Sequence, residues 1–365
     1  MNKKKRVALI CATPYHLYNA INMSRSIYKN ECIDIFVIND FEFSYEYFEK
    51  IRKKAIFNNV YFIRRPIISN IWDKWKLRYA MISDRLDYFN KKNYVKYDII
   101  VTGTLESFSI IFFLSQYKKN HKVEFVLSED GMANYLNCKP LNFNSLIYRL
   151  RKINIETYIN KIYLYKPILS LYNEIYDNLF TINQPDKETI KFAEEIFGVT
   201  DKVLNEVKIN NIIYLDQPLE EMDWDTNRLV VIEKILQYLP SEKFVVKKHP
   251  RKQDFSYEFY NIKVLAEIKV PWEVIGSKVV NKTLVTFNSS AALTPNFIYD
   301  NNNKVIFLYK YFMKDNPLCL EWDRFFYKVR EIYPEHIFIP ETEEELVQVF
   351  DQVKEWGGVI DECNN

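Results

Sequence analysis

The chain has 365 residues, of which 48% are hydrophobic, and its formal net charge is +2. This length allows two domains with separate cores, and the near-neutral charge argues against a protein held to nucleic acid by a general basic field. Only six glycines are present, and neither GxGxxG nor GxxxxGK occurs, which excludes a glycine-rich phosphate loop. A phosphate ligand would have to be bound by helix amino termini and side chains.

The cysteine pattern indicates a reducing compartment, and the apolar runs predict neither a secretion signal nor a membrane span. Five cysteines are scattered without a CxxC pair, so neither a disulfide framework nor a zinc site is expected. The basic start followed by Val7–Ala12 resembles a secretion signal, but its short apolar run is better explained as a first buried strand. No segment approaches the roughly 20 apolar residues of a membrane span. We expect a cytoplasmic protein that can also lie against the inner face of the cell membrane.

Short apolar runs alternate with stretches of helical period, the pattern of α/β units around a parallel sheet. In the first half we predict strands at 7–11, 33–38, 59–63, 98–102 and 123–127, and helices that include 14–28 and 105–116. In the second half we predict strands at 212–215, 243–247, 284–287 and 304–308, and helices that include 228–238, 290–298 and 343–356. The last of these helices has Thr342 placed to cap it.

The middle of the chain predicts the domain boundary. Residues 141–205 read as helical and mixed in charge, so the boundary is expected between about 180 and 208. We assign 1–190 to an amino-terminal Rossmann-like domain with a helical connection and 191–365 to a carboxyl-terminal Rossmann-like domain. Two such α/β domains facing each other across a cleft suit a glycosyltransferase of the GT-B type, and also other two-domain ligand binders.

Three polar motifs follow predicted strands of the two domains. His249, within Lys247-Lys248-His249-Pro250-Arg251, stands at a carboxyl edge where open α/β folds bind ligands, and its cations favour an anion. Glu129 and Asp130 precede Gly131, and one of the two carboxylates could act as a general base. Taken alone, these two motifs are explained by a basic surface loop and by an Asp-Gly turn with a solvated Glu.

The third motif, Asn288-Ser289-Ser290, ends a strand and opens a helix, where hydroxyls and free N–H groups attract phosphate. An ordinary serine cap is the alternative explanation. Upstream, Glu273 in Pro271-Trp272-Glu273 is typical of a first helical turn, yet at this edge its carboxylate could bind a ribose.

The order of these motifs resembles the bacterial sialyltransferases, with the best match in glycosyltransferase family 52, the lipooligosaccharide and capsular sialyltransferases. The acidic Gly loop, His-Pro, Pro-x-Glu and Ser-Ser follow one another, each at a predicted strand end. The first strand-to-helix loop is also similar, which places Thr13, Tyr15 and His16 near the acceptor or phosphate.

This resemblance implies an inverting, metal-independent transfer from CMP-sialic acid to a galactose-type acceptor of a surface glycan. The acceptor would bind the first domain and the donor the second. His249 would contact the donor phosphate and protonate the leaving CMP, and Asp130 or Glu129 would deprotonate the acceptor. The implied donor-binding residues are Lys247, His249, Pro250, Glu273, Asn288, Ser289 and Ser290.

Several alternatives stay open. Asp216 and Asp225, at the entrance of the second domain, could supply the base instead. The Asp223-Trp224-Asp225 triplet lacks the apolar approach strand of a metal-bound nucleotide-sugar site. Another nucleotide-activated donor, or a non-catalytic sugar- or nucleotide-binding protein, fits the same architecture. A homodimer is also compatible with the sequence.

Two aromatic segments have a structural and a functional explanation. We expect Trp72, Trp75, Tyr79 and Tyr88 to pack in the core, although such rings can stack on sugars. The basic and aromatic segment 148–166 reads as a solvated helical face, with peripheral membrane contact as the alternative.

Overall fold

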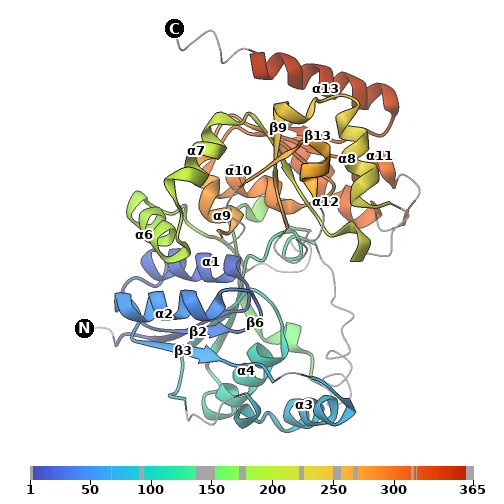
Figure 1. Ribbon diagram of the computed structural model, residues 1–365. Coiled ribbons are helices and arrows are strands. Elements are labelled where there is room, and N and C mark those ends of the chain that lie inside the picture. The colour runs from blue at the N-terminus through green and yellow to red at the C-terminus, as the bar shows by residue number, and fades with distance from the viewer. Residues whose placement is uncertain are drawn as a thin grey trace. The chain divides into compact units, whose positions relative to one another are not determined.

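The protein is described by a computed structural model that covers residues 3–66, 68–89, 94–136, 153–171, 178–221, 226–249, 256–265, 270–313, 316–317 and 319–358. The chain divides into two compact units, Met1–Ile196 and Phe197–Asn365. Each unit contains one sheet in which every strand pair is parallel, with helices around it (Figure 1). The predicted α/β class with two parallel sheets is confirmed.

The sheet of the first unit has the order β3-β2-β1-β4-β5-β6-β7. Its strands are β1 (Arg6–Cys11), β2 (Cys32–Ile38), β3 (Asn59–Ile63), β4 (Ile99–Thr102), β5 (Glu124–Ser128), β6 (Ile159–Leu164) and β7 (Leu179–Thr181). The strand order reverses between β1 and β4. Such a switch point is where open α/β sheets bind their ligands, outside the carboxyl ends of the strands.

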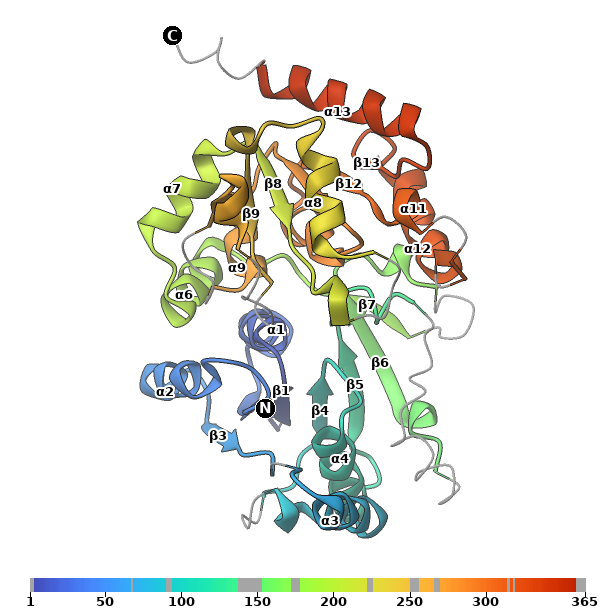
Figure 2. The same cartoon turned by 45° about the vertical axis from the view of Figure 1, so that its right-hand side comes forward.

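Helices of the first unit connect and cover these strands. They are α1 (Pro14–Arg25), α2 (Ser44–Lys54), α3 (Ile71–Ser83), α4 (Ser107–Lys119) and α6 (Lys187–Phe197), with the 3-10 helix η1 at Leu86–Tyr88. Figure 2 shows α3 and α4 side by side, in agreement with their contacts. Phe108 and Phe112 of α4 pack on Phe36 of β2, with ring centroids 6.2 and 4.9 Å away. An aromatic core therefore holds α4 to the sheet.

The second unit repeats the topology in the order β10-β9-β8-β11-β12-β13. Its strands are β8 (Ile212–Leu215), β9 (Phe244–Lys247), β10 (Lys263–Val264), β11 (Thr283–Thr286), β12 (Lys304–Phe307) and β13 (Ile337–Phe338). Its helices include α7 (Asp201–Ile209), α8 (Arg228–Leu236), α9 (Trp272–Ile275), α10 (Thr294–Tyr299), α11 (Tyr309–Phe312), α12 (Cys319–Ile332) and α13 (Glu343–Gly358). The switch point lies between β8 and β11.

Most predicted elements are present. Strands 59–63 and 212–215 are found with the predicted bounds, and Thr342 caps α13 by accepting a hydrogen bond from the Glu345 N–H. The predicted helix 290–298 begins as the 3-10 helix η9 (Ser290–Leu293) and becomes α-helical in α10.

The prediction of a helical region at 141–205 was wrong for part of it. Among the described residues of this region, β6 and β7 extend the first sheet, and the α-helical ones belong to α6 and part of α7. The sequence of β6, INKIYL, has no strict alternation, so its strand character depends on pairing with β5. Within segment 148–166, Lys161 lies on β6 and its Nζ is 2.6 Å from Glu124 Oε2, while residues 148–152 lie outside the described part.

The expected core packing of the aromatic residues near α3 was also wrong. The exposed fractions of Trp72, Trp75 and Tyr79 are 72%, 56% and 59%, and Tyr88 is half-buried. Helical spacing alone could not distinguish an inner face from an outer one. In the described part of the chain, no helix combines the length and the hydropathy needed to cross a membrane.

Candidate active site

The loops after β1, β4 and β5 converge at the switch point of the first sheet. Thr13 caps α1 in an extended conformation, and its Oγ1 accepts a hydrogen bond from the His16 N–H at 3.1 Å. Pro14 at the start of α1 suits its fixed φ. This local geometry places His16 in the first turn of α1, where it is buried at 2% exposure.

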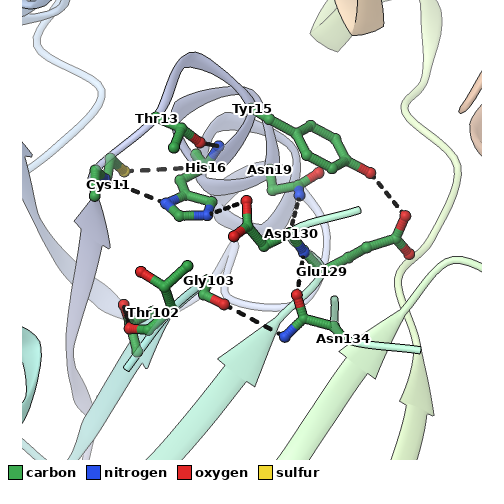
Figure 3. Close-up of polar contacts among 12 residues, drawn as sticks. Cys11, Thr13, Tyr15, His16, Asn19, Thr102, Gly103, Glu129, Asp130 and Asn134 are labelled. Atoms are coloured by element: carbon green, nitrogen blue, oxygen red, sulfur yellow. Dashed lines mark hydrogen bonds and ion pairs between the residues drawn. The ribbon is translucent and has the colours of Figure 1, made fainter. Parts of the chain in front are cut away.

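His16 contacts the acidic loop that follows β5 (Figure 3). The Ala12 N–H donates to His16 Nδ1 at 3.2 Å, so in the neutral imidazole the proton lies on Nε2. Nε2 is 2.7 Å from Asp130 Oδ1. The imidazole therefore lies within ion-pair distance of the Asp130 carboxylate, an arrangement similar to other histidine–carboxylate pairs in which one group fixes the other.

Gly103 and Asn134 complete the support of Asp130. A Cβ on Gly103 would lie 2.1 Å from His16 Nε2, so only glycine allows the imidazole its place. Asn134 accepts a hydrogen bond from the Asp130 N–H at 2.6 Å and donates to the Gly103 carbonyl at 3.3 Å. The loops after β4 and β5 are therefore joined by a hydrogen bond next to His16.

The two carboxylates of the acidic loop have different surroundings. Glu129 is 1% exposed and accepts hydrogen bonds from Tyr15 Oη at 2.8 Å, Tyr135 Oη at 2.6 Å and the Tyr165 N–H at 2.7 Å. Burial raises the pKa of the Glu129 carboxyl to about 7, although these hydrogen bonds act against the rise. The Asp130 side chain keeps 22% of its surface exposed. Of the two, Asp130 is the one that solvent or a substrate can reach.

The sequence indicates the acidic loop and the Thr13-to-His16 loop but not the pairing of His16 with Asp130. The missed residues are Gly103, which follows β4, and Asn134. The scarcity of glycine was an available signal, because Gly103 and Gly131 are two of only six and each follows a strand of the first sheet. Gly131 has a φ of 67°, a conformation that favours glycine.

In the second unit, residues at the end of β8 form hydrogen bonds with the loop after β11 and with the end of β9. Gln217 Oε1 accepts a hydrogen bond from the Asn288 N–H at 2.8 Å, after β11. The Asp216 N–H donates to the Lys247 carbonyl at 3.1 Å, at the end of β9. Asp216 and Gln217 therefore connect the two motifs expected to bind a donor.

Asp216, one of the alternative bases, is 4% exposed, and Arg228 Nη1 lies 3.5 Å from its Oδ2. Burial raises the pKa of the Asp216 carboxyl, and Tyr257, Arg228 and the His249 backbone act in the opposite direction. These surroundings are those of a group that holds the β8 end together. Asp225, the other alternative, lies outside the described residues.

The predicted donor-binding residues lie at one edge of the second sheet. His249 follows β9 and is half-buried, as are Glu273 of α9, Ser289 and Ser290, whereas Lys247 and Asn288 are buried. Ser289 Oγ accepts from the Ala291 N–H at 3.3 Å, so the ordinary capping role is present. Pro250 lies outside the described residues.

A tryptophan links α9 to the serine loop. Trp272 Nε1 donates to the Ala291 carbonyl at 2.9 Å, and Tyr299 Oη donates to the Glu273 carbonyl at 2.8 Å. Both contacts fix the backbone of the turn that carries Glu273. Over the described ranges, no group of three or more His, Cys, Asp or Glu side chains is arranged to hold a metal ion.

Comparisons with known proteins agree with this architecture. The glycotransferase of kitacinnamycin is 8% identical with a TM-score of 0.55, covering 96% of this chain and 91% of that chain. A putative UDP-N-acetylglucosamine 2-epimerase from Listeria monocytogenes is 11% identical with a TM-score of 0.52, covering 97% and 89%. These two likenesses show the fold, which is that of GT-B glycosyltransferases.

A third structure, an α/β-galactoside α-2,3-sialyltransferase from Photobacterium phosphoreum, is 14% identical with a TM-score of 0.49, covering 93% of this chain and 99% of that chain. No curated protein sequence gave a match. The family model described as alpha-2,8-polysialyltransferase matches residues 9–310, and the narrower assignment to family 52 is not confirmed. Because that match spans most of the chain, the protein belongs to the alpha-2,8-polysialyltransferase family of glycosyltransferases.

Proposed function

We propose that the protein transfers sialic acid from CMP-sialic acid to a glycan acceptor, with inversion of the anomeric carbon by direct displacement. The acceptor hydroxyl attacks that carbon, the bond to the phosphate oxygen breaks, and CMP leaves. The observation that carries this proposal is the half-exposed Asp130, fixed by His16 at 2.7 Å at the switch point of the first sheet.

Asp130 is the proposed general base. Its Oδ1 faces His16 Nε2, which leaves Oδ2 to take the proton of the acceptor hydroxyl. The buried His16 lies against the carboxylate, and Asn134 fixes the Asp130 backbone by accepting from its N–H. The group is thus positioned before substrate arrives, which lowers the cost of reaching the reactive geometry. Glu129, buried beneath three donors, supports the loop and does not contact substrate in this proposal.

The second unit is proposed to bind the donor. Ser289 and Ser290 would donate to the phosphate, Glu273 would accept from the ribose hydroxyls, and His249 would protonate the departing CMP. Support comes from the common sheet edge and from Gln217 and Asp216, which fix both loops from β8. Charge neutralisation at the phosphate is the main requirement, since CMP is already a good leaving group.

The acceptor and the metal requirement are also proposals. The family description favours an acceptor that ends in sialic acid, extended through an α-2,8 linkage. A galactose-terminated acceptor of lipooligosaccharide or capsule is the second candidate, from the resemblance to family 52. We propose that the reaction needs no metal and no cofactor, so a chelator should leave the rate unchanged.

The test is incubation of the whole chain with CMP-sialic acid and either lactose or a short α-2,8-linked sialic acid oligomer. Chromatography of released CMP and of the extended glycan measures transfer, with and without chelator. Asp201→Asn, an exposed carboxylate of α7, serves as the control for Asp130→Asn. Protection by CMP against thermal unfolding without any CMP release would indicate a non-catalytic binder. Release only from another nucleotide sugar would replace the donor.

A further inference from the structure

The outer face of α3 has a concentration of exposed apolar side chains. We define this face by the side chains of Ile71, Trp72, Trp75, Tyr79 and Ile82, which are 65%, 72%, 56%, 59% and 53% exposed. Ile68, just before the helix, is 45% exposed. The other exposed large apolar side chains of the described residues are scattered along the rest of the chain. An apolar patch of this kind on a soluble domain marks an interaction surface.

Helical geometry shows that α3 is apolar on two opposite faces. At about 100° per residue, the five side chains of the outer face fall within roughly a third of the helix circumference. Ala80 and Met81 lie on the opposite side and are buried in the core of the first unit, with Leu77 packed against it. Packing on α4 and the core therefore accounts for the inner face but not for the apolar side chains of the outer face.

Cations border the outer face on both sides. By the same helical spacing, Lys74 and Arg78 lie along one border and Lys76 along the other. The Arg78 guanidinium lies over the Trp75 ring, with Cζ 5.1 Å from its centroid. Lys76 Nζ is 3.4 Å from Asp73 Oδ1, but the ammonium-bearing side chain is 67% exposed and the Asp73 side chain only 19%. The surface around the patch therefore presents mainly positive charge.

We propose that the outer face of α3 binds the surface of a membrane that contains anionic lipids. Isoleucines would enter the acyl boundary, the Trp and Tyr rings would lie at the headgroup level, and Lys74, Lys76 and Arg78 would face lipid phosphates. This inference does not depend on the proposed sialyl transfer, because it uses no residue of the candidate active site.

Two other occupants explain fewer of the observations. In a symmetric dimer built on this face, the lysines and Arg78 of the two copies would be brought together and repel. A glycan could stack on the rings beside a hollow of about 390 Å³, which Trp72, Trp75, Tyr79 and Tyr88 help to line. It would leave the exposed Ile71 and Ile82 without a role.

The experiment is cosedimentation of the whole chain with vesicles of phosphatidylcholine, alone or with added phosphatidylglycerol, at low and high salt. We expect binding to the anionic vesicles, and a loss of at least about tenfold in the triple variant Trp72→Gln, Trp75→Gln, Tyr79→Gln. The matched control replaces exposed apolar residues elsewhere, Phe259→Gln with Leu320→Gln, which are 87% and 67% exposed in the wild type.

A second pair of variants tests the charges. Lys74→Glu with Arg78→Glu should weaken binding by about tenfold or more and reduce its salt dependence, because cations near an anionic surface attract it and salt screens that attraction. Lys119→Glu with Lys122→Glu, two exposed lysines outside α3, should bind like the wild type. Thermal unfolding of each variant verifies that it is folded.

Three results would overturn the proposal. The first is that the wild type fails to bind anionic vesicles. The second is that the triple variant binds these vesicles as well as the wild type does. The third is that the triple variant keeps vesicle binding but loses binding to a soluble sialic acid oligomer, or loses dimerisation in sedimentation velocity. Transfer to a soluble acceptor should be the same in the triple variant and the wild type, so the outcome is separable from that of the proposed function.

Discussion

The polar clusters at the two switch points are built differently. In the first unit, buried neighbours surround the proposed base: His16 lies 2.7 Å from Asp130, and Asn134 and Gly103 fix the loops around both. In the second unit, the proposed ligands His249, Ser289 and Ser290 are half-buried at the edge. The buried Gln217 holds the serine loop, and the buried Asp216 holds the end of β9 before His249.

This difference corresponds to two kinds of task. A general base must have one orientation and one charge state before the acceptor arrives, which a buried hydrogen-bond network provides. A donor site must exchange water for phosphate and ribose, so its ligands remain accessible while the backbone that carries them is held. Variants of Asp130, His16 and Glu129 change the proposed base and its surroundings, whereas variants of Ser289 and Ser290 change the proposed donor site.

The largest effect is expected from Asp130→Asn. Loss of the general base should reduce kcat by about 10²- to 10⁴-fold, while the affinity for CMP stays close to that of the wild type. Steady-state transfer and calorimetric CMP binding measure the two quantities. If Asp130→Asn transfers like the Asp201→Asn control, the base lies elsewhere.

The next effect is expected from His16. In His16→Ala, Asp130 loses the imidazole that lies 2.7 Å from its Oδ1, and kcat should fall by about 10²-fold with little change in the donor KM. His16→Gln carries an amide N–H that can reach toward Asp130 and should recover part of the activity. A purely structural role for His16 predicts equal losses of kcat in both variants, in proportion to their losses of thermal stability. That result would contradict the proposal that the buried network orients Asp130.

A smaller effect is expected in the second unit. Replacing Ser289 and Ser290 together by Ala should weaken CMP binding by about tenfold and raise the donor KM, since each hydrogen bond contributes about 0.7 kcal/mol net after exchange with water. Ser241→Ala, outside the sheet edge, is the control. An unchanged affinity for CMP in the double variant would show that these hydroxyls only cap the helix.

The smallest effect concerns the pH dependence of stability. The pKa of Glu129 is raised to about 7 by burial from an ordinary value of 4.5, so the folded protein binds a proton that the unfolded chain has released. The free energy of unfolding should therefore fall between about pH 4.5 and pH 7, by up to about 3 kcal/mol, and this contribution is absent above that range.

Glu129→Gln resembles the protonated side chain and should flatten this slope. Urea unfolding at a series of pH values measures it, with the exposed Glu188→Gln as the control. A slope identical in Glu129→Gln and the wild type would mean that another group causes it. It would also mean that burial does not raise the pKa of Glu129 in solution.

Residue patterns predicted the polar residues of single loops better than the contacts between different loops. The acidic loop, the serine loop and the strand ends were found because short apolar runs and turn residues are local signals. The pairing of His16 with Asp130 joins residues far apart in sequence, and the space for the imidazole depends on Gly103 in a third loop. No local pattern contains that information.

By itself, the sequence determined that the chain forms two α/β units with parallel strands, and which polar residues end those strands, because both follow from hydrophobic period and turn chemistry. Only the tertiary structure decided that Asp130 is accessible while Glu129 is buried, that Asp216 is buried beside Arg228, and that the Trp72 face of α3 is exposed. Burial and pairing depend on which elements pack together, and neighbouring residues in the chain can have opposite environments.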